Sequence, residues 1–240
     1  AEPLKPIDNS SPRGTLLGFM DVITETYRLG IGSYLEYLQT DQLYMNPNVA
    51  SGFDAAQKSV RRIRRCFDFS GLPPATSKEA SRRLVIQLKE VLDRVKLPSA
   101  SEIPDQAMMK STGMTKWVIP DTEITLERIE DGPRAGEYIF SPRTLERVPE
   151  FYELIKNQPY RITTTEGWYK LQTQSPLGVA IALHRIIPPR WILTDNPGWF
   201  VKTQILNQPI WRWIGMVVLS LAALIWLRFM FHFSFRLSSR

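Results

Sequence analysis

The chain has 240 residues, of which 43% are hydrophobic and 22% are charged, and this balance excludes general disorder. The formal net charge is +6. Of the 30 basic side chains four lie after Pro209, so residues 1–209 hold 26 basic and 24 acidic side chains and carry only +2. The positive excess therefore lies in the C-terminal stretch. This distribution argues against a general nucleic-acid binder and for a cationic flank beside a membrane.

The N-terminal half of the sequence predicts an arm followed by helices. Residues 1–12 hold three prolines and no apolar period, which predicts an extended arm. Ser11 and Pro12 then predict a helix start, because serine at the N-cap accepts a hydrogen bond from the helix and proline fits its first position. We expect a helical region over residues 13–98. Its clearest amphipathic stripe is Phe53, Ala56, Val60, Ile63 and Phe67.

Two features interrupt or flank these helices. Gly30 and Gly32 lie inside the first expected helix and predict either a break or a close contact between helices. Cys66 adjoins the apolar stripe, so we expect it to be buried and inert. As the only cysteine, it also excludes an intramolecular disulfide and a cysteine-based metal site.

Residues 115–175 change in character and predict a β-hairpin unit with a short helix. The runs "TKWVIP", "TEITLERI" and "GEYIFS" are rich in strand-forming residues, and "EDGPRAG" between the last two predicts a hairpin loop. Ser141 and Pro142 repeat the Ser-Pro helix start, and we expect the helix to reach about Asn157.

The C-terminal stretch, residues 209–235, predicts a transmembrane helix. Between Arg212 and Arg228 lie 15 uncharged residues. A span of the hydrocarbon core, about 30 Å thick, takes about 20 residues at about 1.5 Å each, and both arginines can extend toward opposite interfaces. A buried core helix is the alternative, but no polar face interrupts the run. The predicted anchoring side chains are Trp211, Trp213, Trp226, Arg212 and Arg228.

The flanks of this helix predict its orientation. Residues 236–240 hold two arginines and no acid, which predicts a cytoplasmic C-terminal end. The N-terminal part is then expected outside the cytoplasm, in a periplasm or lumen. The first residue is alanine, which a removed signal peptide or trimming would explain. Residues 176–208 are rich in proline and tryptophan and are expected next to the membrane.

The expected fold class is α+β. We expect a mainly helical extracytoplasmic domain with a small antiparallel β unit, followed by one C-terminal transmembrane helix.

The sequence offers no recognisable catalytic, metal or cofactor site. His184 and His232 are its two histidines, and the sequence has no His-x-x-x-His pair, glycine-rich phosphate loop or nucleophile elbow. The acids Glu123, Glu127, Glu130 and Asp131 are expected on a solvated strand and loop face. We therefore predict no enzymatic activity and no cofactor. An exported enzyme on a membrane anchor is the least favoured alternative.

A basic stretch, "KSVRRIRRCF", lies on the expected second helix opposite its apolar stripe. The solvent face of an amphipathic helix is the simplest interpretation. Contact with anionic lipid headgroups or with a neighbouring subunit is the alternative, and it would use Arg61, Arg62 and Arg65.

Five segments together resemble one known arrangement and cover most of the chain. They are "PLKPIDNSSPRGTLLGFMD" (3–21), "LKEVLDRVKLP" with "EIPD" (88–105), "WVIPDTEITLERIEDGPRAGEYIFSP" (117–142), "VPEFYELIKNQPYR" (148–161) and "NQPIWRWIG" (207–215). The chain resembles the N-terminal extracytoplasmic part and first membrane helix of the larger small-conductance mechanosensitive channels. The "IPDTEI…GPRAGEYIFSP" block is the most specific part of the resemblance.

This resemblance implies a homo-oligomeric, heptameric channel that opens under membrane tension and protects cells from osmotic swelling. The family's pore helix and cytoplasmic β-rich domain have no counterpart in these 240 residues, so no pore residue is assigned. The expected role of the chain is then assembly or tension sensing, with the lipid bilayer and further copies of itself as partners and no nucleic acid. The alternative is a single-pass accessory subunit without enzymatic activity that docks onto another membrane protein complex. Further spans in the reading frame would indicate the channel, and a stop codon near Arg240 the accessory subunit.

Overall fold

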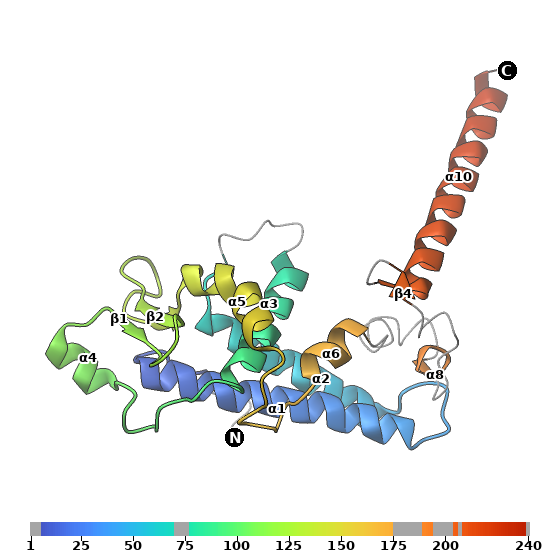
Figure 1. Cartoon of the computed structure of the whole chain (residues 1–240). Helices are drawn as coiled ribbons and strands as arrows, with labels where there is room; N and C mark the ends of the chain where they lie inside the picture. Colours follow the sequence, from blue (N-terminus) through green and yellow to red (C-terminus); the bar gives the residue numbers. More distant parts are fainter. Residues whose placement is uncertain (1–5, 70–76, 175–188, 194–203, 206–207, 239–240) are drawn as a thin grey trace. The chain divides into compact units, whose positions relative to one another are not determined.

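The computed structural model describes residues 6–69, 77–174, 189–193, 204–205 and 208–238 (Figure 1). The chain divides into two compact units, residues 1–173 and residues 174–240. The first, here called unit 1, holds most of the helices and a three-stranded antiparallel sheet, and the second, unit 2, ends in one long helix. The predicted α+β fold class is therefore confirmed.

The first two helices of unit 1 lie side by side along most of their length (Figure 1). They are α1 (Pro12–Leu38) and α2 (Pro47–Ile63), and η1 (Arg64–Cys66) continues from α2 as a short 3-10 helix. The predicted start of α1 is confirmed, because the Ser11 hydroxyl accepts a hydrogen bond from the Gly14 N–H at 3.2 Å. Asn46 caps α2 in the same way, accepting from the Val49 N–H at 2.9 Å.

The glycines of α1 do not have the role that the sequence suggested. The helix runs unbroken through Gly30 and Gly32, and a Cβ atom at either position would meet no atom within 4 Å. The predicted break or close contact at these positions is wrong. The close approach of the helices occurs instead at Gly52 of α2, where a Cβ would come within 1.9 Å of the Ser33 hydroxyl oxygen.

The sheet consists of β1 (Lys116–Val118), β2 (Thr125–Arg128) and β3 (Tyr138–Phe140), in that spatial order. The predicted hairpin between the second and third runs is confirmed, with Leu126 opposite Phe140. The N-terminal arm and the end of η1 border β3. The Tyr138 N–H donates to the Asn9 carbonyl at 2.7 Å, and Phe67 forms an isolated bridge with Phe140.

Four more helices complete unit 1. They are α3 (Ser77–Leu92), α4 (Gln106–Thr112), α5 (Pro142–Ile155) and α6 (Trp168–Gln174). The Ser141 hydroxyl accepts from the Thr144 N–H at 3.1 Å, which confirms the second predicted Ser-Pro start. The short helices α4 and α6 were not predicted. Each has only seven residues, which is too short for an apolar period to stand out.

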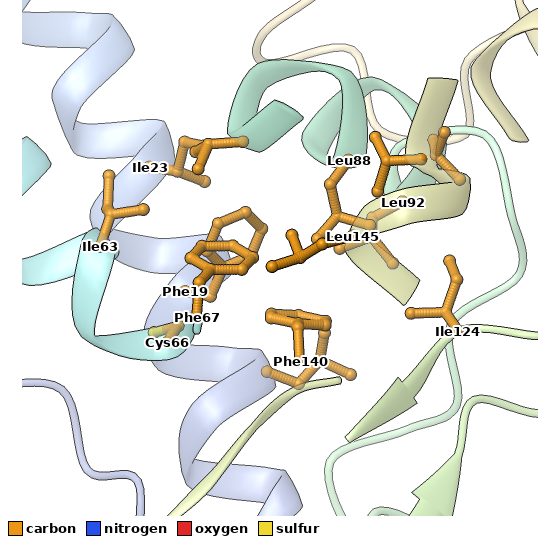
Figure 2. Packing of buried hydrophobic residues seen from close by; sticks show 14 of the residues in the cluster. Phe19, Ile23, Ile63, Cys66, Phe67, Leu88, Leu92, Ile124, Phe140 and Leu145 are labelled. Atoms are coloured by element: carbon orange, nitrogen blue, oxygen red, sulfur yellow. The ribbon is translucent and has the colours of Figure 1, made fainter. Parts of the chain in front are cut away.

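The core of unit 1 lies where α1, η1, α3, β3 and α5 meet (Figure 2). Three phenylalanines fill its centre. The Phe19 ring meets the Phe67 and Phe140 rings edge-on, with centroids 5.4 and 5.3 Å apart, and Phe67 stacks on Phe140 at 5.1 Å. The helical region and the β unit therefore share one core. Other buried members of the cluster are Ile23, Ile63, Leu88, Leu92, Ile124 and Leu145.

Unit 2 holds α8 (Pro189–Ile192), the paired strands β4 (Gln204–Ile205) and β5 (Gln208–Pro209), and α10 (Ile210–Ser238). Most of the predicted 176–208 segment lies outside the described residues, as do the side chains of 229–238. In the part of the chain that the structure does describe, a search for helices with the length and hydropathy of a membrane span found none.

Replacing the central ring of the core tests this packing. Phe19 is fully buried, so Phe19→Ala is expected to lower the free energy of unfolding by about 3–5 kcal/mol through lost contacts and a residual cavity. Leu17→Ala is the matched control on the same helix, because Leu17 is exposed, and should cost less than about 1 kcal/mol. Denaturant unfolding followed by circular dichroism measures both. Equal losses in the two variants would contradict the assigned core.

Candidate functional site

The C-terminal helix α10 presents an apolar surface on all sides. It is 29 residues long, which at about 1.5 Å per residue exceeds the thickness of a hydrocarbon core, about 30 Å. Four consecutive positions, Met216 to Leu219, are all exposed, so no single face is polar. The exposed large apolar side chains are Trp213, Ile214, Met216, Val217, Val218, Leu219, Leu221, Leu224, Ile225 and Trp226.

All five predicted anchoring residues lie on α10. Trp226 is 66% exposed, Trp213 is 37% exposed, and the Arg228 side chain is exposed as well. The side chains of Trp211 and Arg212 lie outside the described residues. The two described tryptophans stand 13 positions apart, or about 20 Å along the helix.

The three arginines of the predicted contact surface have different surroundings. Arg61 is exposed and has no ion pair with the described residues. Arg62 is partly buried and lies 4.0 Å from a Glu25 carboxylate oxygen on α1. Arg65, on η1, pairs with Glu137 at 3.2 Å. Two of the three therefore bind other parts of unit 1, and only Arg61 has its charge uncommitted within the described residues.

Glu137 is the centre of a small polar cluster beside β3. It accepts hydrogen bonds from Arg134 at 2.7 and 2.9 Å and from the Asn9 amide at 3.4 Å. Burial raises the pKa of Glu137, but the bonds from Arg134 and Asn9 outweigh it and lower the pKa below its usual value. The Asn9 amide also donates to the Arg65 carbonyl at 3.1 Å. The cluster joins the N-terminal arm, η1 and β3.

Cys66 lies under this cluster and is fully buried, as predicted. Burial raises the pKa of its thiol to about 12, and the neighbouring arginines counteract this only in part. A thiol with such a pKa is not a nucleophile near neutral pH.

The acids of the β unit lie on the surface. Glu123 pairs with Arg147, Glu127 with Lys116 and Glu130 with Arg128. Asp131 is exposed. Within the described residues, no three His, Cys, Asp or Glu side chains come together as metal ligands. The side chains of His184 and His232 lie outside the described residues.

A buried group of charges on α3 was not predicted from the sequence. Lys89, in the last turn of α3, pairs with Asp93 just beyond the end of the helix, and both side chains are at most 1% exposed. Thr165 completes the group, because its hydroxyl donates to Asp93 at 2.6 Å and accepts from the Lys89 ammonium at 3.1 Å. Burial lowers the pKa of Lys89, although Asp93 acts in the opposite direction.

A second buried ion pair, between Glu90 of α3 and Arg94 just beyond its end, lies beside the first. Arg94 donates to the Glu90 carboxylate at 2.7 Å, and its guanidinium lies 3.7 Å from the centre of the Tyr160 ring. The Tyr160 hydroxyl donates to Glu90 at 2.6 Å, and the Tyr169 N–H donates to the other Glu90 oxygen at 3.1 Å. Burial raises the pKa of Tyr160, and its bond to Glu90 acts in the same direction.

These two pairs fasten one irregular segment to α3. The segment is residues 156–169, which connects α5 to α6. The backbone N–H groups of Arg161 and Ile162 both donate to the Asp93 carbonyl, at 2.8 and 3.0 Å. We call Lys89, Glu90, Asp93, Arg94, Tyr160 and Thr165 the α3 ionic network. Its charges are buried and paired, and its bonds hold segment 156–169 against α3.

Comparison with protein-family models, with curated proteins and with solved structures gave no match.

Removing one member of the α3 ionic network tests its contribution to folding. Asp93→Ala leaves the Lys89 ammonium buried without its partner, and the free energy of unfolding is expected to fall by about 3–5 kcal/mol. The double variant Lys89→Met/Asp93→Leu removes both charges and should recover much of this loss.

Glu150→Ala is the matched control, because Glu150 pairs with Arg147 on the surface at 3.0 Å, and solvent-exposed ion pairs contribute little to folding stability. Denaturant unfolding measures all three variants. A loss in Asp93→Ala as small as that in Glu150→Ala would show that the buried pair does not hold the fold.

Proposed function

We propose that this chain is a membrane-anchored, non-enzymatic part of a mechanosensitive channel-like protein. In this proposal α10 is a transmembrane helix and unit 1 is an extracytoplasmic domain for assembly or tension sensing in osmotic protection. The observation that carries the proposal is the exposed apolar surface of α10. Its ten exposed large apolar side chains, Trp213 to Trp226, would stand in water unless lipid or protein covers them.

A bilayer is the cover that fits this surface best. A partner helix covers one side of a helix, whereas the exposed positions here include four in succession. Burying each large apolar side chain contributes about 1.5–3 kcal/mol, so ten of them outweigh the cost of one arginine near the end of the span. Trp213 and Trp226 stand near the two ends of the uncharged run between Arg212 and Arg228, and tryptophan there suits the membrane interfaces.

The charges at the C-terminal end of the chain support the proposed topology. Arg236 and Arg240 would stay on the cytoplasmic side, which leaves unit 1 in the periplasm or a lumen. Residues 1–173 hold 23 basic and 23 acidic side chains, so unit 1 has no net charge to attract nucleic acid.

The α3 ionic network gives unit 1 a way to resist force from the membrane. The chain leaves unit 1 through segment 156–169 and α6, and it continues through unit 2 to α10. Tension thins a bilayer and changes its match to a helix, so α10 would tilt or shift. Any pull along the chain then reaches segment 156–169, which the buried bonds to Asp93 and Glu90 hold on α3. Unit 1 would thereby restrain α10, the proposed membrane helix.

An accessory subunit that docks onto another membrane complex is the second candidate. One observation favours a docking surface on unit 1. Leu154 on α5 is 70% exposed and borders a groove of about 420 Å³ lined also by Val91, Phe151 and Ile155. A copy of the same chain or a different subunit could cover this groove.

The membrane proposal is tested by expressing the full chain and washing the membrane fraction at alkaline pH. The chain is expected to stay in the membrane pellet. Leu219→Arg/Leu221→Arg should move most of it to the wash, because each arginine near the helix centre opposes insertion by about 2.5–3.5 kcal/mol. Leu43→Arg, at an exposed leucine of unit 1 outside the proposed docking groove, is the control and should not change the distribution. Release of the unaltered chain by the wash would refute the span.

The two candidate functions predict different assemblies. Native mass spectrometry of the full chain, extracted gently from its own membranes, should give a multiple of the chain's own mass if it assembles with itself. A stoichiometric complex with other subunits would instead support the accessory role. A monomer free of other proteins would contradict both.

A further inference from the structure

Unit 1 contains a cavity that neither the proposed anchor nor the proposed assembly uses. Its volume is about 430 Å³, and it is lined by α3, α5 and α6 and by Asp68, which follows η1. This volume is within the range of small-ligand pockets. The wall includes Arg83, Leu84 and Gln87 from α3, Leu145 and Glu146 from α5, and Tyr169 from α6.

The Gln87 side chain in the cavity wall is only partly satisfied. It is 6% exposed, and its Nε2 donates to the Tyr169 hydroxyl at 3.1 Å. Its Oε1 is buried and has no hydrogen-bond partner among the described residues. If the amide is turned the other way, the nitrogen is left unpaired instead. A buried amide with one unpaired end is costly, so a partner that the unit itself does not supply is expected.

The Tyr169 hydroxyl has a matching free capacity. It accepts the bond from Gln87, and among the described residues no acceptor is recorded for its own proton. The wall therefore offers one hydrogen-bond acceptor and one donor next to each other. A peptide amide carries the complementary donor and acceptor in the same group.

The rest of the wall suits the two ends and the side chains of a short peptide. Arg83 on α3 and Glu146 on α5 are exposed and carry opposite charges. They can pair with a terminal carboxylate and a terminal ammonium. Leu84 and Leu145 are buried and provide apolar contact between them.

We propose that this cavity binds a short peptide through one of its amide groups. The peptide N–H donates to Gln87 Oε1, and the peptide carbonyl accepts from the Tyr169 hydroxyl. Oε1 is covered in the unliganded protein, so the Gln87 amide must rotate toward the cavity. This movement breaks the hydrogen bond from Gln87 Nε2 to Tyr169 and brings both ends of the Gln87 amide to the cavity, where the peptide amide takes the place of the lost contact.

Calorimetric titration of the full chain in mild detergent tests the proposal. The probes are the tripeptide Ala-Leu-Ala with free termini and the same tripeptide with an acetylated N-terminus and an amidated C-terminus. Saturable binding at up to millimolar concentration is expected. Gln87→Leu keeps the size of the side chain and removes its amide, and it should weaken binding at least about tenfold.

Arg83→Ala and Arg82→Ala form a matched pair of neighbouring exposed arginines on α3, of which only Arg83 lines the cavity. Arg83→Ala should weaken binding of the free tripeptide, and Arg82→Ala should not. This pair decides the proposal even if Gln87→Leu does not fold, which circular dichroism would reveal.

The two probes separate the sources of the peptide. Tighter binding of the free form assigns the site to soluble peptides, and tighter binding of the blocked form assigns it to an extended segment inside a protein. Either result supports the amide contact if binding depends on Gln87, and dependence of the free form on Arg83 places the peptide in this cavity. Absence of saturable binding for both probes, or wild-type affinity in both Gln87→Leu and Arg83→Ala, overturns the proposal.

Discussion

Two ion pairs at the C-terminal end of α3, Lys89 with Asp93 and Glu90 with Arg94, are removed from water inside unit 1. Desolvating four charges is expensive, and their attraction offsets that cost only when further hydrogen bonds satisfy the remaining atoms. Segment 156–169 supplies those bonds through Tyr160, Thr165 and two backbone N–H groups. The burial of the charges and the position of the segment therefore depend on each other. Neither would persist alone.

Apolar side chains have two different surroundings in this chain. In unit 1, α1 and β3 bring Phe19 and Phe140 into one aromatic cluster that excludes water. In unit 2, α10 turns Leu219 and Ile225 outward, each with about 70% of its surface exposed. The first arrangement is the interior of a folded domain, and the second is the surface that lipid would cover. The proposed function follows from this contrast.

Local signals in the sequence were enough to predict the elements that have a recognisable capping residue, turn sequence or apolar period. Ser11 and Ser141 before prolines fix two helix starts, because the cap bond forms within four residues of chain. The hairpin between β2 and β3 follows from its loop composition. Cys66 was correctly expected inside, since it adjoins an apolar stripe that faces α1.

Contacts between distant segments could not be predicted in this way. Charges of opposite sign four residues apart, as in Lys89 and Asp93, normally lie on the solvent face of a helix. Their burial depends on Thr165, which is 76 residues from Lys89. The arginines of α2 and η1 were grouped as one surface, yet Glu25 and Glu137 pair with Arg62 and Arg65 separately. The cavity beside Gln87 has no sequence signal either, because three helices form it.

The central claim is that the α3 ionic network carries force between unit 1 and the chain leading to α10. Optical tweezers test it most directly, with handles on the full chain at Arg28→Cys and Ile210→Cys, since the native Cys66 thiol is buried. We expect a first rupture that frees the residues from about 156 to 209. We also expect that Glu90→Gln/Asp93→Asn lowers the force of this rupture, while Glu150→Gln leaves it unchanged. An equal rupture force in all three proteins would contradict the account.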